Sequence, residues 1–205
     1  MAQVSLSKLP TISGDLFGRE QELRLLDEVW ADPQTHVIML SAWGGVGKTA
    51  LVNHWLTAME RDGYRGAEQV YGWSFYSQGT REDKQASGDE FIAHALEWFG
   101  DPDPAKGAPW DKGVRLALLV RARRTLLILD GLEPLQYPPG EMKGRLRDQG
   151  VLALLKELAR AGSDWGLCAI TTRLLVPELA EMKRGAVRLK ELENLSNEAG
   201  AQLLR

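Results

Sequence analysis

Residues 36–49 read HVIMLSAWGGVGKT, an apolar run followed by a glycine-rich turn and a Gly-Lys-Thr step. The run has the length and composition of a buried strand, and after Lys48 the residues Leu51, Val52 and Trp55 recur at helical spacing. A strand, a glycine-rich turn and a helix in this order let backbone N–H groups converge on an anion at the start of the helix. The stretch therefore predicts a phosphate-binding loop in an α/β protein.

The side chains of this loop have separate expected roles. Lys48 brings a positive charge to the β- and γ-phosphates of a nucleotide, and the hydroxyl of Thr49 can bind Mg²⁺. Ala42 stands where the usual pattern has its first glycine, so we expect an ordinary φ there. A glycine turn followed by Lys-Thr by chance is the alternative, which the strand-before-helix context disfavours. The residues expected to hold the nucleotide are Gly44, Gly45, Val46, Gly47, Lys48, Thr49 and Ala50.

The composition bounds the class of protein. The chain has 205 residues, enough for one domain with a full core, and its 44% hydrophobic content is that of an ordinary soluble protein. A net charge of −3 makes nucleic acid an unlikely general partner, although a local basic patch stays open. The single cysteine, Cys168, lies in an apolar stretch and is expected to be a buried, inert thiol. We see no secretory signal and no apolar stretch of ~18 residues, so we expect no membrane partner and a cytoplasmic protein.

Apolar strand-like runs alternate with segments of helical periodicity along the chain. This alternation predicts an α/β fold, a three-layer P-loop NTPase fold with a mostly parallel five-stranded sheet. The five expected strands cover residues 37–41, 69–76, 125–130, 167–172 and 187–190. We expect three parts: a flexible N-terminal arm over 1–14, a nucleotide-binding domain over 15–192, and the start of a truncated helical subdomain over 193–205, where Ser196 would cap a helix.

Charged residues follow two of the buried runs. Asp130 closes the run Leu-Leu-Ile-Leu, and because ligands lie at the carboxyl edge of parallel sheets, we expect it to hold Mg²⁺; capping a turn with Gly131 is the alternative. Glu133 either orients the attacking water or is a solvated acid in a loop, and the sequence does not decide between these two roles. Arg173 ends another run and is expected to sense the γ-phosphate, the alternative being a surface arginine that starts a helix. Lys48, Asp130, Glu133 and Arg173 are thus the expected catalytic group.

Together these motifs resemble the nucleotide-binding domain of the STAND class of P-loop ATPases, close to the NB-ARC and NACHT groups. The resemblance runs from about Leu16 to the last residue. It implies that Phe17, Gly18 and Arg19 lie against the adenine, because Phe-Gly-Arg-Glu resembles the Gly-Arg segment of the class. The remaining matching segments are 44–49 for the phosphate loop, 73–78 for a strand ending in Ser-Gln, 126–131 for the metal strand, 171–173 for the sensor, and 192–204 for the start of the helical domain.

The resemblance implies a regulatory switch that binds ATP or ADP with Mg²⁺ and hydrolyses ATP slowly. It also implies self-association of the full-length protein, effector and sensor domains outside this segment, and signal transduction in defence or regulated cell death. The guanine-specific signature Asn-Lys-x-Asp does not occur in the sequence, which favours ATP over GTP.

Three alternatives remain at the level of the sequence. A motor or loader ATPase acting on nucleic acid would need a basic channel, and the net negative charge argues against it. A small-molecule kinase would need an acceptor pocket and a catalytic arginine lid, and the sequence offers no clear candidate for either. A nucleotide-binding scaffold that never hydrolyses is the third alternative, because the role of Glu133 is open.

Overall fold

The computed structural model describes residues 2–12, 14–76, 88–160, 165–182 and 185–195. The expected helix capped by Ser196 lies outside these residues. The strands are β1 Gln3–Lys8, β2 Val37–Ser41, β3 Gln69–Ser74, β4 Thr125–Asp130, β5 Gly166–Thr172 and β6 Val187–Glu191. The helices are α1 Glu20–Ala31, α2 Lys48–Arg61, α3 Gly88–Trp98, α4 Pro109–Arg121, α5 Gln149–Leu158 and α6 Pro177–Ala180, with 3₁₀ turns at Gly63–Gly66 and Glu133–Leu135.

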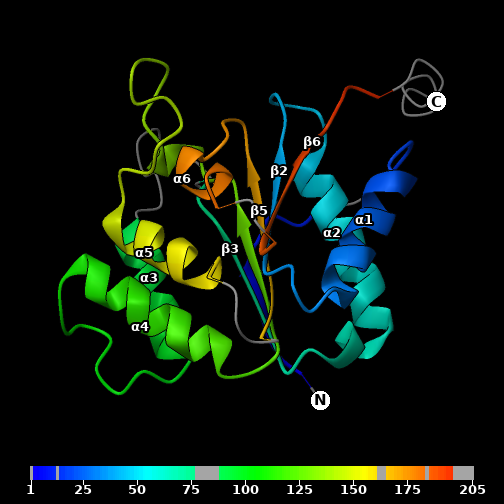
Figure 1. The fold of residues 1–205 in the computed structure, drawn as a ribbon. Helices are drawn as coiled ribbons and strands as arrows, with labels where there is room; N and C mark the ends of the chain where they lie inside the picture. The colour runs from blue at the N-terminus through cyan, green and yellow to red at the C-terminus, as the bar shows by residue number, and fades with distance from the viewer. Residues whose placement is uncertain (1, 13, 77–87, 161–164, 183–184, 196–205) are drawn as a thin grey trace.

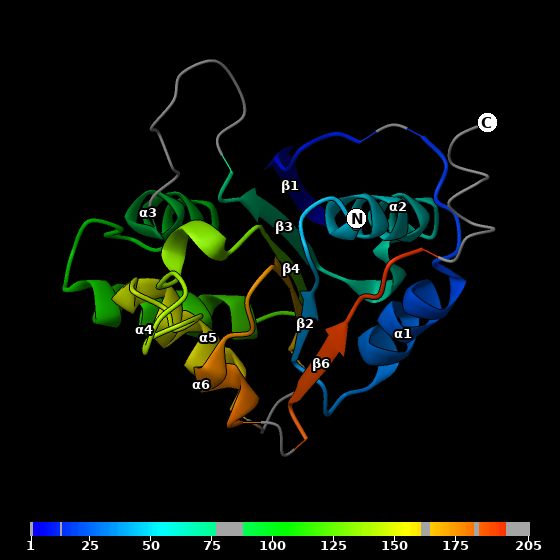
Figure 2. The same cartoon turned by 90° about the horizontal axis from the view of Figure 1, so that it is seen from above.

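The strands form one sheet in the order β1-β3-β4-β5-β2-β6, and every neighbouring pair is parallel. Parallel neighbours need crossover connections, and the helices that make them cover both faces of the sheet (Figures 1 and 2). α1 and α2 lie on one face, and α3, α4, α5 and α6 lie on the other. The α/β class and the three layers are therefore as the sequence predicts.

Alternate residues of each buried strand point to opposite layers. In β2, Val37 and Met39 join the core against α3, α4 and α5, whereas Ile38 and Leu40 join the core against α1 and α2. Burial on both faces explains why the central strands are continuous apolar runs rather than alternating ones. Cys168 of β5 is fully buried, which raises the pKa of its thiol and agrees with the expected inert cysteine.

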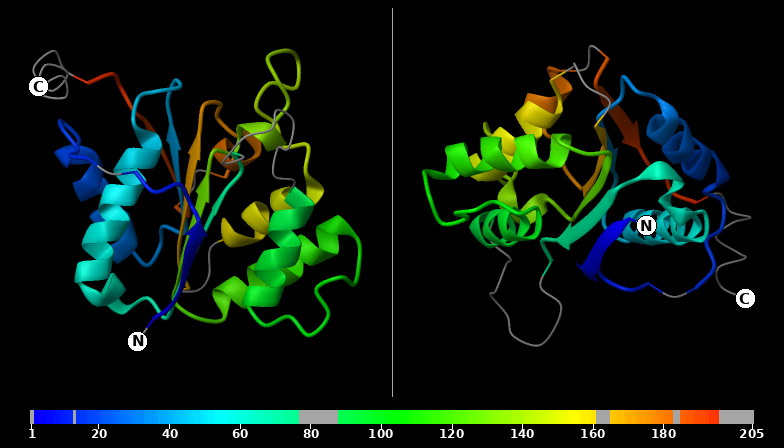
Figure 3. Two further views of the ribbon diagram at one scale, coloured as in Figure 1. Left: turned by 180° about the vertical axis from the view of Figure 1, so that it is seen from behind. Right: turned by 90° about the horizontal axis from the view of Figure 1, so that it is seen from below.

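Two expectations about the strands were wrong. Over the residues that the structure describes, the sheet has six strands rather than five, because Gln3–Lys8, expected in a flexible arm, pairs with β3 as the edge strand β1 (Figure 3). Most β1 side chains are exposed or half-buried, so the segment lacks the continuous apolar run of the inner strands. The strand expected over 69–76 ends at Ser74, which leaves Tyr76 outside the ladder.

All six strands point the same way, so their carboxyl ends meet at one edge. In the ladder Ser41 stands beside Thr172, and Ser74 stands beside Asp130. β5 lies between β2 and β4, which brings the residues that follow it between the phosphate-binding loop and Asp130. Among the helices that the structure describes, none is long and apolar enough to cross a membrane.

Candidate nucleotide-binding site

The glycine-rich loop joins β2 to α2 and has the backbone that its sequence requires. Gly45 and Gly47 have φ values of +82° and +94°, and Gly47 is the residue that precedes the first turn of α2. Gly44 lies close to Arg173, because a Cβ there would lie 3.3 Å from Cζ of that side chain. Ala42 is not among the positive-φ residues of the described chain, as expected. The loop therefore presents α2 with an open N-terminus that suits an anion.

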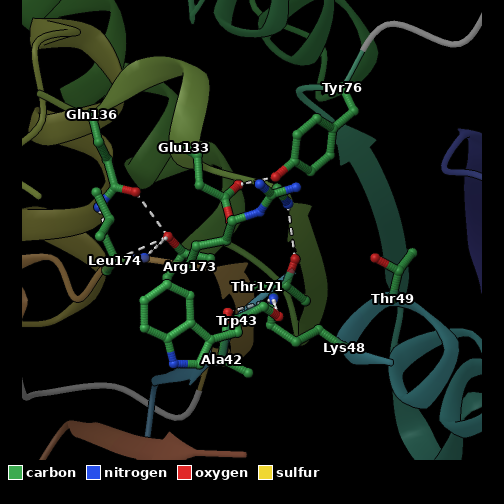
Figure 4. A network of polar contacts seen from close by, with 12 residues as sticks. Ala42, Trp43, Lys48, Thr49, Tyr76, Glu133, Gln136, Thr171, Arg173 and Leu174 are labelled. Carbon is green, nitrogen blue, oxygen red and sulfur yellow. Dashed lines mark hydrogen bonds and ion pairs between the residues drawn. The ribbon is translucent and has the colours of Figure 1, made fainter. Parts of the chain in front are cut away.

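Lys48 is held under the loop by two backbone carbonyls. Its Nζ donates to the oxygen of Ala42 at 2.7 Å and to that of Trp43 at 3.0 Å (Figure 4). An ammonium group has three N–H donors, so one is left for a further acceptor. Burial lowers the pKa of Lys48, and the neighbouring Arg173 lowers it further, whereas Glu133 and Asp130 raise it. A phosphate placed over the loop would supply the acceptor and the negative charge that this buried cation lacks.

Asp130 is the centre of a hydroxyl cluster at the end of β4. Its Oδ1 accepts from the hydroxyls of Thr49 at 2.9 Å and Thr171 at 2.7 Å, and its Oδ2 accepts from that of Ser74 at 3.1 Å. The hydroxyl of Thr171 in turn accepts from the N–H of Gly131 at 2.8 Å. The side chains therefore fix a carboxylate that is only 1% exposed beside the first turn of α2.

The donor set at this point fits magnesium. The hydroxyl of Thr49 and the carboxylate of Asp130 are hard oxygen ligands, and they come within hydrogen-bond distance of each other. The described residues contain no group of three or more His, Cys, Asp or Glu that could hold a metal by itself. Mg²⁺ commonly takes one or two protein oxygens and completes its shell with phosphate and water, and when bound it neutralises charge on phosphate oxygens. Thr49 and Asp130 are the residues that would hold it here.

Glu133 lies in the 3₁₀ turn after β4 and is oriented by Tyr76. The hydroxyl of Tyr76 donates to Oε2 of Glu133 at 2.6 Å, and Nε of Arg173 lies 3.8 Å from Oε1 (Figure 4). Burial and this contact with Glu133 both raise the pKa of Tyr76. The ring reaches the site because Gly131 has no side chain; a Cβ there would lie 2.1 Å from Cε2 of Tyr76. Oε1 of Glu133 is buried and accepts no hydrogen bond from the described residues, so the ion pair with Arg173 is the contact that the structure gives this oxygen.

For the slow ATP hydrolysis that the resemblance implies, we expect Tyr76→Phe to lower the turnover by ~3- to 10-fold while leaving KM for ATP nearly unchanged. The reason is that the phenolic hydroxyl holds Glu133 but does not point at the phosphate-binding loop. Steady-state phosphate release separates the two parameters, and Tyr64→Phe, in the 3₁₀ turn that follows α2, is the matched control. An unchanged turnover, or a loss confined to KM, would show that Tyr76 does not position the carboxylate.

The Gly-Arg segment contacts the phosphate-binding loop through Arg19. Gly18 has a φ of +64°, and Phe17 is half-buried. Arg19 is 3% exposed, and its Nη2 donates to the carbonyl of Val46 at 3.0 Å and to that of Glu193 at 2.8 Å. Arg19 therefore ties the segment before α1 to the loop and to the chain that leaves β6, and its expected contact with adenine stays a prediction.

The structure thus brings Lys48, Thr49, Asp130, Glu133 and Arg173 to one edge of the sheet. Three further polar residues complete the arrangement, namely Ser74, Tyr76 and Thr171. They lie in the segments 73–78 and 171–173 that resemble the STAND class, but none of them was expected individually as a site residue. A polar residue at the end of a fully apolar run was the available signal for Ser74 and Thr171, as it was for Asp130. For Tyr76 no local signal exists, because its contact with Glu133 depends on β3 lying beside β4.

A parallel sheet, a Gly-Lys-Thr loop after one inner strand and an aspartate at the end of another define a P-loop NTPase domain. Residues 36–205 match the NACHT domain, and the chain belongs to this family, a STAND-class group of P-loop NTPases. No curated protein matched the sequence.

Solved structures support the same fold. The Aeropyrum pernix ORC1 protein, solved in complex with DNA, aligns with a TM-score of 0.59 at 18% identity over 93% of this chain and 49% of that chain. The Aeropyrum pernix ORC2 protein, solved as ADPNP-ADP complexes, aligns with a TM-score of 0.53 at 15% identity over 88% of this chain and 49% of that chain. The chain therefore spans about half the length of these proteins.

Proposed function

We propose that this domain is an ATP/ADP-dependent switch that hydrolyses ATP slowly with Mg²⁺ and controls self-association of the protein that carries it. One observation carries the proposal: the hydroxyl of Thr49 lies 2.9 Å from Oδ1 of Asp130, so the phosphate-binding loop and the metal carboxylate meet at one point. Membership in the NACHT family supports a nucleotide as the ligand.

The geometry suggests how the third phosphate would be distinguished. The guanidinium of Arg173 lies against Gly44 of the loop and close to Glu133, where the end of a triphosphate would reach. A diphosphate would leave this guanidinium with Glu133 and the ring of Tyr76, whose centroid is 5.8 Å from Cζ. ATP shifts a conformational equilibrium only if it binds the two states with different affinity, and in this proposal Arg173 supplies that difference.

We expect Arg173→Ala to weaken ATP binding by ~10-fold and to change ADP binding by less than ~2-fold, because only the γ-phosphate would pair with this guanidinium. Calorimetric titration with each nucleotide in the presence of Mg²⁺ measures both affinities. Arg160→Ala is the control, since Arg160 is exposed at the end of α5 and pairs with Glu157. An equal loss for ATP and ADP would remove the sensor role.

A scaffold that binds nucleotide without hydrolysis is the second candidate, and a specific contact favours it. Tyr76 occupies Oε2 of Glu133, and Arg173 lies beside Oε1, so both oxygens of the expected catalytic carboxylate have neighbours in the chain itself. Release of phosphate from Mg·ATP by the wild-type chain, lost in Glu133→Gln, would decide against the scaffold. No release from the wild type would decide for it.

Action on nucleic acid is the weaker alternative. The ORC1 neighbour was solved with DNA, but at 18% identity the likeness extends to the fold alone. The net charge of −3 offers no general attraction for phosphate backbones. By its resemblance to the STAND class, we propose that this domain acts in signal transduction, with a role in defence and a cytoplasmic location.

In this proposal the full-length protein self-associates, and effector and sensor domains outside this segment receive and supply the signal. ADP would favour a closed monomer and ATP an assembled form. Sedimentation velocity of the intact protein with ADP and then with ATP tests this part, and identical profiles would contradict it.

A further inference from the structure

A second cavity lies beside the phosphate-binding loop, at the same edge of the sheet. Its volume is about 980 Å³, and it crosses the ends of β5 and β2 from the loop after β4 toward the end of β6. Gly44, Glu133 and Arg173 line it, whereas Lys48 and Thr49 do not, so it adjoins the end of the expected phosphate site. We call it the side groove and define it by Trp43, Tyr137, Pro138, Lys143, Arg147 and Leu175.

Apolar side chains in the side groove are unusually exposed. The indole of Trp43 is 82% exposed although the residue belongs to the phosphate-binding loop, and Leu175 is 48% exposed. Tyr137 and Pro138 line the same cavity from the loop after β4. Soluble domains seldom leave an aromatic side chain on a concave surface without a partner, and such surfaces mark binding sites. The body of the occupant is therefore apolar or aromatic.

The charges around the groove favour an anion. Lys143 and Arg147 are exposed on the loop after β4, and Lys143 forms no ion pair with another described residue. Arg147 donates to the carbonyl of Pro134 at 2.7 Å, which holds its guanidinium near the groove without neutralising it. Glu191 at the far end is the only lining carboxylate besides Glu133, which is engaged by Tyr76. An acidic group at the basic end would therefore be favoured.

We propose that the side groove is a second ligand site, which takes a small anion with an aromatic or apolar body. The volume lies at the upper end of the ~300–1,000 Å³ typical of small-molecule sites. In this site the ring of the ligand packs on Trp43, and its acidic group pairs with Lys143 and Arg147. The proposal goes beyond the nucleotide switch, because the groove extends away from the phosphate-binding loop to Tyr137, Lys143 and Arg147 and takes a different ligand.

Two residues connect the side groove to the nucleotide site. The carbonyl of Trp43 accepts the hydrogen bond from Lys48 Nζ, and Arg173 lines the groove while contacting Gly44. A ligand that holds Trp43 or Arg173 in one conformation changes the affinity of the loop for nucleotide. By linkage, bound nucleotide changes the affinity of the groove for its ligand by the same factor. The groove ligand therefore acts as an effector of the switch.

The test uses 1-anilinonaphthalene-8-sulfonate, an aromatic anion, and N-phenyl-1-naphthylamine, its uncharged analogue, in fluorescence titrations of the chain without nucleotide. We expect one sulfonate site that Trp43→Ala weakens by at least ~10-fold. Lys143→Glu should lower the affinity for the sulfonate by ~5- to 10-fold and leave the affinity for the uncharged amine unchanged. Lys106→Glu, on the connector before α4, should alter neither affinity. Unchanged binding in Trp43→Ala, or equal effects of the two lysine variants, would overturn the site.

A second titration tests the connection. Saturating Mg·ATP should change the affinity for the sulfonate by at least ~3-fold, and the sulfonate should change the affinity for ATP by the same factor. Equal sulfonate affinity with and without bound ATP would overturn the effector role. Failure of the chain to bind ATP would overturn the proposed function, while the titrations without nucleotide would still decide whether the groove binds an aromatic anion.

Discussion

Replacing Lys48 by alanine is expected to weaken the binding of both ATP and ADP by at least ~100-fold, equivalent to about 2.7 kcal/mol. The ammonium group of this side chain lies directly beneath the loop, where two carbonyls leave its remaining N–H free for the expected phosphates. Its removal takes away a charge-assisted contact and leaves the carbonyls of Ala42 and Trp43 without their donor. Calorimetric titration in the presence of Mg²⁺ measures the loss.

Lys106→Ala is the matched control for this experiment. Lys106 is exposed on the connector between α3 and α4, and it lies outside the site described here, so its variant should bind both nucleotides like the wild type. Far-ultraviolet circular dichroism checks that the Lys48 variant keeps its fold. A folded Lys48→Ala protein with wild-type affinity would contradict the assignment of this loop.

Asp130→Asn is expected to remove the magnesium dependence of ATP binding and to lower turnover by ~100- to 1,000-fold. Asparagine keeps the shape of the side chain but loses the charge. If its amide oxygen accepts from Thr49 and Thr171, its amide nitrogen faces the hydroxyl of Ser74 and cannot accept from it. The disturbed hydrogen bonds should lower the free energy of unfolding by about 1–2 kcal/mol. ATP affinity measured with Mg²⁺ and then with a chelator gives the metal dependence directly.

Asp111→Asn serves as the control for the loss of a carboxylate. Asp111 is an exposed acid in the first turn of α4, so its variant should keep both the metal dependence and the turnover. If Asp130→Asn retained the wild-type difference between magnesium and chelator, the metal would have to be held elsewhere.

The inner sheet could be predicted because its strands are buried on both faces. Runs such as Leu126–Leu129 have no polar residue that would allow another assignment, and the glycines of the loop mark where β2 must end. The carboxyl edge of a parallel sheet then brings together residues that are far apart in sequence. This rule correctly placed Lys48, Asp130 and Arg173 at one site, although their roles remain predictions.

The missed features depend on contacts that local sequence does not encode. β1 is stabilised by pairing with the edge of β3. Its short alternation of polar and apolar residues does not by itself predict a strand or identify its partner. Tyr76 reaches Glu133 only because β3 lies beside β4 and Gly131 leaves room for the ring. The buried bonds of Arg19 to Val46 and Glu193 join three segments whose proximity follows from the assembled fold.

Titration calorimetry of the wild-type chain with ATP and ADP, with and without Mg²⁺, tests the central claim most directly. We predict that both nucleotides bind at one site, that ATP binding strengthens when the metal is present, and that the metal effect is smaller for ADP. If neither nucleotide bound in the presence of Mg²⁺, the loop of Gly44–Thr49 and the carboxylate of Asp130 would not form a nucleotide site.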